Sequence, residues 1–240
     1  MRGQLIGLNP MYFYKVGLGV SESNRQAIHS AICSLVDEEA ENFDAFTDTA
    51  WLGDINASGD FHTIPEMQPL LERLPFALGE YFEALGVNAE KFQAYISRCW
   101  PAYQTVGQEI HLHRHMQSNI SGVYYVDVPP ESGEFAFYFY DVACEFIPGL
   151  FSSDAHAEKG LLKSWNLMRA TEVPLVMETD QLILFPSKTL HRVHPSKNYD
   201  KPRISIAFDI NVTLRSSDKQ EAGMPPLDKW QGIDVLSNPS

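Results

Sequence analysis

The sequence has few cysteines, and this shortage limits the kinds of site that it can form. Cys33, Cys99 and Cys144 are odd in number, and their spacing fits neither a CxxC pair nor a zinc-ligand pattern. We therefore expect reduced, mostly buried thiols and a cytoplasmic protein, with no disulfide framework.

Positive charge is also scarce, with 18 Lys and Arg against 31 Asp and Glu and a formal net charge of −13. Such a field repels phosphate backbones and anionic membrane surfaces, although a local basic spot can still bind a small anion. No stretch approaches the roughly 20 apolar residues of a membrane span, and the N-terminus lacks the pattern of a signal peptide. We expect a small-molecule, amino-acid or peptide substrate, no nucleic acid and no membrane partner; a homodimer stays open.

The chain divides into a helical part and a strand-rich part. Of its 240 residues, 44% are hydrophobic, which is enough for a full core. The spacing of apolar residues predicts a strand within residues 5–19 and helices within 21–43 and 63–86, the second interrupted at Pro75. From Phe92 onward, short aromatic or β-branched segments separated by turn residues predict a sandwich, jelly roll or barrel. The expected strands are 92–100, 109–115, 120–128, 134–140, 181–187 and 203–212.

A long interruption separates two groups of these strands, at residues 141–172. An insertion of this length in a compact β domain is typical of a functional lid or a mobile loop, so we expect substrate specificity there. We interpret residues 1–214 as one domain, with a helical part at about 20–90 and a β core at about 92–212. Residues 215–240 then form a C-terminal extension.

A run of alternating histidines, His111, His113 and His115, lies in the stretch "EIHLHRHMQS" from Glu109 to Ser118. Side chains at every second position of a strand share one face, so the three imidazoles should point the same way. Neutral imidazole is the commonest metal ligand in proteins. The spacing is equally compatible with a solvated polar strand face, and alone it does not decide between the two.

A second polar element surrounds the last expected strand. The strand from Leu182 to Phe185 leads to a turn that presents His191, and a new strand begins at Arg203. In that strand Arg203, Ser205 and Ala207 share a face, so a cation and a hydroxyl point together. Arginine is suited to binding a carboxylate through two parallel hydrogen bonds.

The HxH pair, a later histidine and an R-x-S pair twelve residues after it together resemble the Fe(II)/2-oxoglutarate-dependent dioxygenases. More closely, the chain resembles the small putative 2OG-Fe(II) oxygenase family with the pattern H-x-H-P-x-S-x-x-S-G-V-Y-Y. That stretch is "HRHMQSNISGVYYV" here, from His113 to Val126. Trp100, Gly107, "LFPS…LHRVHP", "RISIAF" and "LNPMYFYKV" extend the similarity.

The resemblance implies a mainly β (α+β) fold, a double-stranded β-helix of the jelly-roll or cupin-like type, with N-terminal helices packed on the sheet. It also implies two cofactors, Fe(II) and the cosubstrate 2-oxoglutarate, and no catalytic residue beyond the metal site. The residues that it assigns are His113, His115 and His191 as metal ligands, and Arg203, Ser205 and Tyr125 as cosubstrate-binding residues.

The third metal ligand stays open at this point. His115 stands where the wider superfamily has Asp or Glu, which would replace the 2-His-1-carboxylate triad by three histidines. Asp141 could supply a carboxylate instead, and His111 could be a ligand or a neighbour of the site. His194 is expected to support the site or to lie in a loop.

The activity implied by the resemblance is oxidation of a C–H bond, with hydroxylation as the usual outcome and release of succinate and CO2. A rival hypothesis is a cupin-like protein that uses three histidines to hold a metal for a non-oxidative or ligand-binding role. A third is a metal-free jelly-roll interaction module. Arg203 and Ser205 favour the oxygenase, since a three-histidine hydrolase does not require these two residues.

Overall fold

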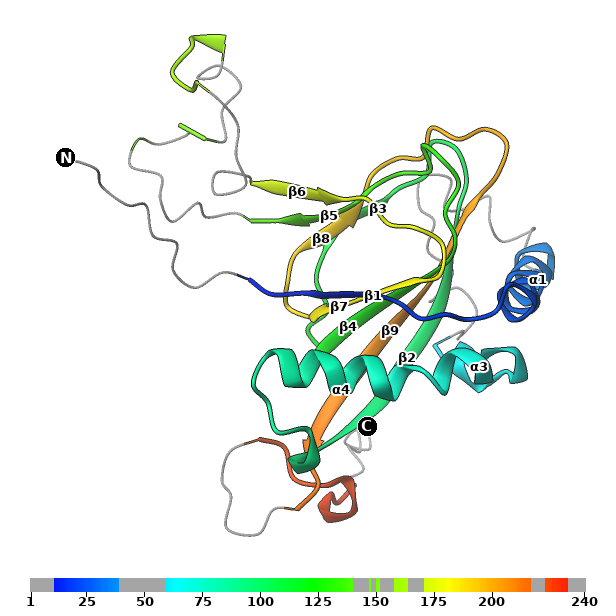
Figure 1. The fold of residues 1–240 in the computed structure, drawn as a ribbon, viewed down its shortest axis with the longest axis vertical. Helices are drawn as coiled ribbons and strands as arrows, with labels where there is room; N and C mark the ends of the chain where they lie inside the picture. The colour runs from blue at the N-terminus through cyan, green and yellow to red at the C-terminus, as the bar shows by residue number, and fades with distance from the viewer. Residues whose placement is uncertain are drawn as a thin grey trace, which may run out of the picture.

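The computed structural model describes residues 11–38, 59–139, 147, 150–151, 158–163, 171–216 and 223–232. Within them, the strands form two antiparallel sheets that face each other (Figure 1). The larger sheet has the order β1-β7-β4-β9-β2 and the smaller one the order β3-β8-β5-β6. The predicted fold class, a mainly β jelly roll with few helices, is confirmed.

The strand bounds follow the sequence pattern closely in the larger sheet. Its strands are β1 (Tyr14–Gly17), β2 (Phe92–Gln104), β4 (Ile120–Asp127), β7 (Gln181–Pro186) and β9 (Arg203–Leu214). The smaller sheet has β3 (Ile110–His113), β5 (Phe135–Tyr138), β6 (Glu172–Leu175) and β8 (His191–Val193). The sequence analysis missed β8, which has only three residues, and β6, which contains Pro174. His191 was assigned to a turn, but it is the first residue of β8.

The helices precede the β core, as expected. They are α1 (Glu22–Glu38), α3 (Gln68–Leu71) and α4 (Leu74–Ala84), with 3-10 turns at Phe61–Thr63, Pro65–Met67 and Ala89–Lys91. One more 3-10 turn, Leu227–Lys229, follows the core. Pro75 lies in the first turn of α4, where its missing N–H costs no helical hydrogen bond. The predicted interruption is therefore the boundary between α3 and α4. No described helix has the length and hydropathy needed to cross a membrane.

Two apolar clusters lie on opposite faces of the larger sheet. The helices cover its outer face (Figure 1), where Ile28 and Ile32 of α1 and Leu78 of α4 join a cluster with Ile206 and Phe208 of β9. The second cluster lies between the two sheets. It comprises Tyr125, Phe135, Phe137, Met177, Ile183, Phe185 and Val193.

The predicted insertion at 141–172 lies mostly outside the described residues, and so does Asp141. Its role in specificity stays a prediction. The domain bounds given above are likewise a prediction. The strands that carry the histidines and Arg203 lie within the described residues, so the site can be built from them.

Candidate functional site

Three histidines converge between the two sheets. One ring nitrogen each of His113, His115 and His191 lies within 4.8 Å of the others. His113 ends β3 and is the register partner of His191 on β8, which brings their side chains together. The backbone N–H of His115 donates to the carbonyl of Ser187, at 2.9 Å, and so holds the loop after β3 against the end of β7.

The rings of His113 and His191 are oriented by backbone carbonyls. Nδ1 of His113 lies 2.7 Å from the carbonyl oxygen of His111, and Nδ1 of His191 lies 2.8 Å from that of Thr189. A carbonyl oxygen only accepts hydrogen bonds, so each Nδ1 carries the proton. Each neutral ring therefore presents Nε2, with its lone pair, to the space between the sheets.

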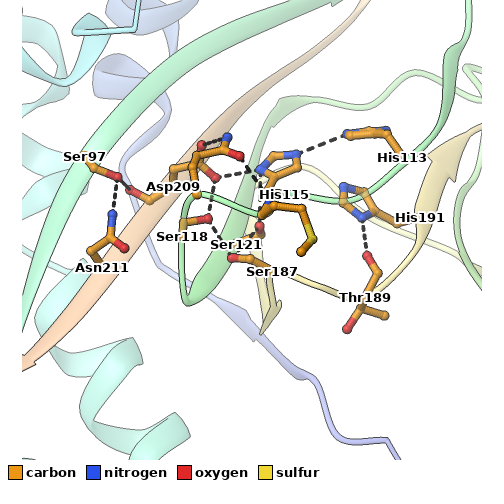
Figure 2. A network of polar contacts seen from close by, with 12 residues as sticks. Ser97, His113, His115, Ser118, Ser121, Ser187, Thr189, His191, Asp209 and Asn211 are labelled. Atoms are coloured by element: carbon orange, nitrogen blue, oxygen red, sulfur yellow. Dashed lines mark hydrogen bonds and ion pairs between the residues drawn. The ribbon is translucent and has the colours of Figure 1, made fainter. Parts of the chain in front are cut away.

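The ring of His115 is oriented by a carboxylate. Its Nδ1 lies 2.6 Å from Oδ1 of Asp209, which is fully buried (Figure 2). Asp209 also accepts hydrogen bonds from Gln117 and Ser118. Burial by itself would raise the pKa of Asp209, but the hydrogen bonds from His115, Ser118 and Gln117 outweigh it and lower the pKa. The acceptor behind His115 is therefore a carboxylate ion.

The geometry of these rings fits a cation. Nε2 of His113 and Nε2 of His115 lie 3.1 Å apart, and since both Nδ1 atoms are the donors, two lone pairs face each other. Two neighbouring ligand nitrogens about 2.1 Å from one ion are roughly 3 Å apart. Burial lowers the pKa of His113, and burial with the neighbouring imidazole of His113 lowers that of His191 to about 3. Both rings are therefore neutral near pH 7, as metal ligation requires.

A buried arginine lies farther along the interior. Arg203, the first residue of β9, is 2% exposed, and its Nη1 donates to Oε1 of Gln104 at 3.2 Å. Its Nε is buried and has no hydrogen-bond partner among the described residues, and the same holds for the hydroxyl of Tyr125. Cζ of Arg203 lies 4.9 Å from the centre of the Tyr125 ring. Unmatched buried donors are costly, so this pair is suited to an anionic ligand.

One cavity connects the histidines to Arg203. His113, His115 and His191 line it together with Arg203 and Ser205. Tyr125 is the register partner of Ser205 on the neighbouring strand β4. Burial raises the pKa of the Tyr125 phenol, which Arg203 opposes, so the hydroxyl keeps its proton near pH 7. The structure thus brings all six residues predicted from the sequence into one region.

Three residues of this region were missed by the sequence analysis. Trp100 lines the cavity and its ring centre lies 5.6 Å from that of His115, while Gln104 holds Arg203. Asp209 is the third. The alternation that places Arg203, Ser205 and Ala207 on one face continues to Asp209, so this signal was present in the sequence.

His111 does not share the face of the other two histidines, and that prediction is wrong. A bulge between Ile110 and His113 interrupts the alternation of β3, so Ile110 and His113 both line the cavity. The side chain of His111 is 62% exposed, with Nδ1 at 3.4 Å from a carboxylate oxygen of Glu109. His194 lies 2.7 Å from a carboxylate oxygen of Glu172, which makes it part of a side-chain pair outside the histidine cluster.

Comparison with known proteins identifies a family that matches the segment carrying these residues. Residues 98–209 match the model of a family described as putative 2OG-Fe(II) oxygenase, and all six predicted residues fall in this range. A search among curated proteins gives no significant match. The family match confirms the predicted family for this segment. It also confirms the predicted enzyme class and the two cofactors, Fe(II) and 2-oxoglutarate.

Solved structures share the fold at low sequence identity. SnoK, described as a non-heme alpha ketoglutarate dependent carbocyclase from nogalamycin biosynthesis, has a TM-score of 0.52 at 12% identity, covering 93% of this chain and 90% of that one. AviO1 from Streptomyces viridochromogenes Tue57 has 0.52 at 11%, covering 83% and 90%. HygX from Streptomyces hygroscopicus with iron bound has 0.50 at 14%, covering 90% and 92%. At these identities the likeness shows the fold alone.

Proposed function

We propose that this chain, whose residues 98–209 match the putative 2OG-Fe(II) oxygenase family, hydroxylates a C–H bond of a small molecule, an amino acid or a peptide. The reaction would couple this oxidation to conversion of 2-oxoglutarate into succinate and CO2. The observation that carries the proposal is one cavity lined by three converging imidazoles and by an arginine with an unmatched buried donor.

The metal ligands in this proposal are Nε2 of His113, His115 and His191. Each ring is already oriented through its Nδ1, so little ordering is needed when the metal binds. Bound Fe(II) would supply the activation of O2 that hydroxylation requires. The chain's own contribution is to hold three imidazole nitrogens about one point in a cavity that Phe135 and Phe185 also line.

The cosubstrate would lie between the metal and Arg203. The guanidinium offers donors to the distal carboxylate of 2-oxoglutarate, and Gln104 keeps it in place through the Nη1 hydrogen bond. The hydroxyls of Ser205 and Tyr125, opposite each other on β9 and β4, would donate to the same carboxylate. An anion here would satisfy both the Nε of Arg203 and the Tyr125 hydroxyl, which have no hydrogen-bond partner in the part of the chain that the structure describes.

A second candidate, a cupin-like protein with a non-oxidative or ligand-binding role, is favoured by the all-histidine ligand set, which also suits Zn2+. The two candidates differ in what they require of Arg203. A non-oxidative zinc site needs no cation at the far end of the cavity, whereas a 2-oxoglutarate site does.

An anaerobic titration separates the candidates. We expect purified protein with Fe(II) to develop a visible charge-transfer band when 2-oxoglutarate is added. His113→Ala should abolish both iron binding and the band, while His111→Ala, the matched control on the same strand, should keep both. Iron-replete protein that shows no band at saturating 2-oxoglutarate would exclude the oxygenase.

The third ligand has its own experiment. His115→Ala and Asp141→Ala are compared by the iron bound per chain under anaerobic conditions. We expect His115→Ala to lose iron affinity and Asp141→Ala to retain it, because His115 already faces the other two imidazoles. The reverse result would assign the third ligand to Asp141.

A further inference from the structure

A three-histidine site lacks the negative charge that the 2-His-1-carboxylate set of non-haem iron oxygenases brings to the metal. Here a carboxylate lies directly behind one of the three rings, that of His115. We propose that Asp209 is a positioning residue that makes His115 a metal ligand and supplies, through the imidazole, the charge that a carboxylate ligand would bring. This inference rests on the proposed function, since it assumes a metal at the histidine cluster.

The side-chain hydrogen bonds of Asp209 with the described residues lead to one short segment. Oδ1 accepts from Nδ1 of His115 at 2.6 Å and from Oγ of Ser118 at 2.8 Å, and Oδ2 accepts from Nε2 of Gln117 at 2.9 Å (Figure 2). One carboxylate therefore ties three side chains of the loop that follows β3 to β9, in addition to the hydrogen bonds of Asn119 with Ile210 and Val212. Asp209 fixes the direction in which the His115 ring faces, and it adds to the backbone hydrogen bonds that hold this loop.

The same contact fixes the tautomer of His115. A carboxylate ion has no proton to donate, so the proton of the imidazole is held on Nδ1 and Nε2 is left as the ligand atom. The hydroxyl oxygen of Ser187 lies 2.8 Å from that of Ser118 and 3.0 Å from that of Ser121, and these contacts hold the surroundings of the ring in place. A ring that is fixed in tautomer and direction binds a metal with little loss of freedom.

The three histidines differ in the charge behind them. His113 and His191 donate to neutral backbone carbonyls, whereas His115 donates to an ion. A carboxylate acceptor makes the imidazole a more basic ligand. Taken with Asp209, the ligand set carries one negative charge, the same as two histidines and one carboxylate. His115 with Asp209 thus replaces the carboxylate by a longer unit of equal charge.

The test compares three variants of the whole chain. Asp209→Ala removes the acceptor, and we expect anaerobic Fe(II) or Co(II) affinity to fall about 10- to 100-fold. Asp209→Asn keeps an acceptor but removes the charge, so we expect a smaller loss of affinity and a more positive Fe(III)/Fe(II) midpoint potential. Asn211→Ala is the matched control on the same strand. It removes a hydrogen bond to Ser97 at 2.8 Å and should leave both quantities unchanged.

A double-mutant cycle distinguishes positioning from a general structural role. If Asp209 acts through His115, then Asp209→Ala should cost no further Co(II) affinity in a His115→Ala background. An undiminished loss in that background would overturn the proposal, as would wild-type affinity in Asp209→Ala. If Asp209→Ala does not fold, the midpoint potential of Asp209→Asn decides, and a value equal to that of the wild type overturns the proposal.

The metal site itself is tested separately by His113→Ala. Loss of metal in His113→Ala, together with unchanged binding in both Asp209 variants, would reject the role of Asp209 and leave the proposed function standing. Retention of full metal affinity in His113→Ala would reject the proposed site and, with it, the inference about Asp209.

Discussion

The two faces of β9 are both buried, but one carries apolar side chains and the other mostly polar ones. One face carries Ile204, Ile206, Phe208 and Ile210, which pack under the helices in the outer apolar cluster. The other face carries Arg203, Ser205, Ala207 and Asp209, and three of these are polar although all three are almost inaccessible to solvent. Strand alternation alone places the two sets back to back.

The two faces of β9 differ in whether the protein alone supplies the contacts that their buried side chains need. The side chains of the apolar face pack against other apolar side chains of the protein, so this face stabilises the fold without any ligand. On the polar side, Nε of Arg203 and the hydroxyl of Tyr125 on β4 have no hydrogen-bond partner among the described residues. Three imidazole nitrogens, from β8, β3 and the loop after β3, lie within 4.8 Å of one another on this side. The apolar face therefore stabilises the fold, whereas the buried polar groups on the other side gain their remaining partners only when ligands bind.

The largest expected effect is on the apolar face. Phe208→Ala removes a fully buried ring beneath the helices and should lower the free energy of unfolding by about 3–5 kcal/mol. Urea denaturation measures this loss. The Fe(II) and 2-oxoglutarate dissociation constants of the folded variant should stay near those of the wild type. A large change in either constant would contradict the separation of the two faces.

The next effect is on the polar face. Arg203→Met should weaken 2-oxoglutarate binding by about 2–4 kcal/mol, because the carboxylate loses its charged partner. Iron affinity and the free energy of unfolding should change little, since an apolar side chain replaces a buried charge of similar size. Calorimetric titration measures the affinity. Arg192→Met is the control, since Arg192 pairs with Glu109 at the edge of the smaller sheet.

In metal-free protein, the histidine cluster should make the free energy of unfolding depend on pH. His191 has its pKa lowered from 6.5 to about 3 by burial and by His113, so the folded state stays unprotonated where the unfolded chain binds a proton. Its contribution to stability is therefore intact above pH 6.5 and is lost as the pH falls toward 3, at up to about 1.4 kcal/mol per pH unit.

Urea denaturation in the presence of a chelator at pH 7.5, 6.5 and 5.5 measures this slope. His191→Gln should flatten it, and His111→Ala should not, because His111 is largely exposed. An equal slope in wild type and His191→Gln would show that other groups cause the acid sensitivity.

The smallest effect is expected at Tyr125. Tyr125→Phe removes a buried hydroxyl that has no hydrogen-bond partner among the described residues, so the free energy of unfolding should stay within about 1 kcal/mol of the wild type or rise slightly. The affinity for 2-oxoglutarate should fall by about 1 kcal/mol, since one neutral hydrogen bond is lost. Unchanged affinity, measured by the same calorimetric titration, would remove Tyr125 from the cosubstrate site.

Much of the fold could be predicted because long strands can be recognised from their residue composition. The strands of the β core that belong to the larger sheet are aromatic or β-branched, and those segments were placed correctly. β8 was missed because three residues cannot display a period, and β6 because Pro174 lies within its four residues. The position of His191 on a strand depends on its pairing with β3 and β5, which is a non-local property.

The site could be predicted in part for the same reason. His113 and Arg203 follow from local spacing and from the family resemblance, and the structure brings them to one cavity. The exposure of His111 could not be foreseen, because strict alternation assumes a regular strand and a bulge breaks it. Strand alternation places Asp209 on the same face as Arg203 and Ser205. Its contact with His115 could not be predicted, because that contact depends on the path of the loop after β3.

The bulge in β3 gives positions 111 and 113 different tolerance to sequence change. Position 111 contributes to the site through its carbonyl oxygen, which every amino acid possesses, whereas position 113 contributes an imidazole that no other side chain reproduces. In a library of substitutions selected for activity, position 111 should therefore accept many residue types and position 113 only histidine. Three histidines that look equivalent in the sequence thus carry different amounts of information about the reaction.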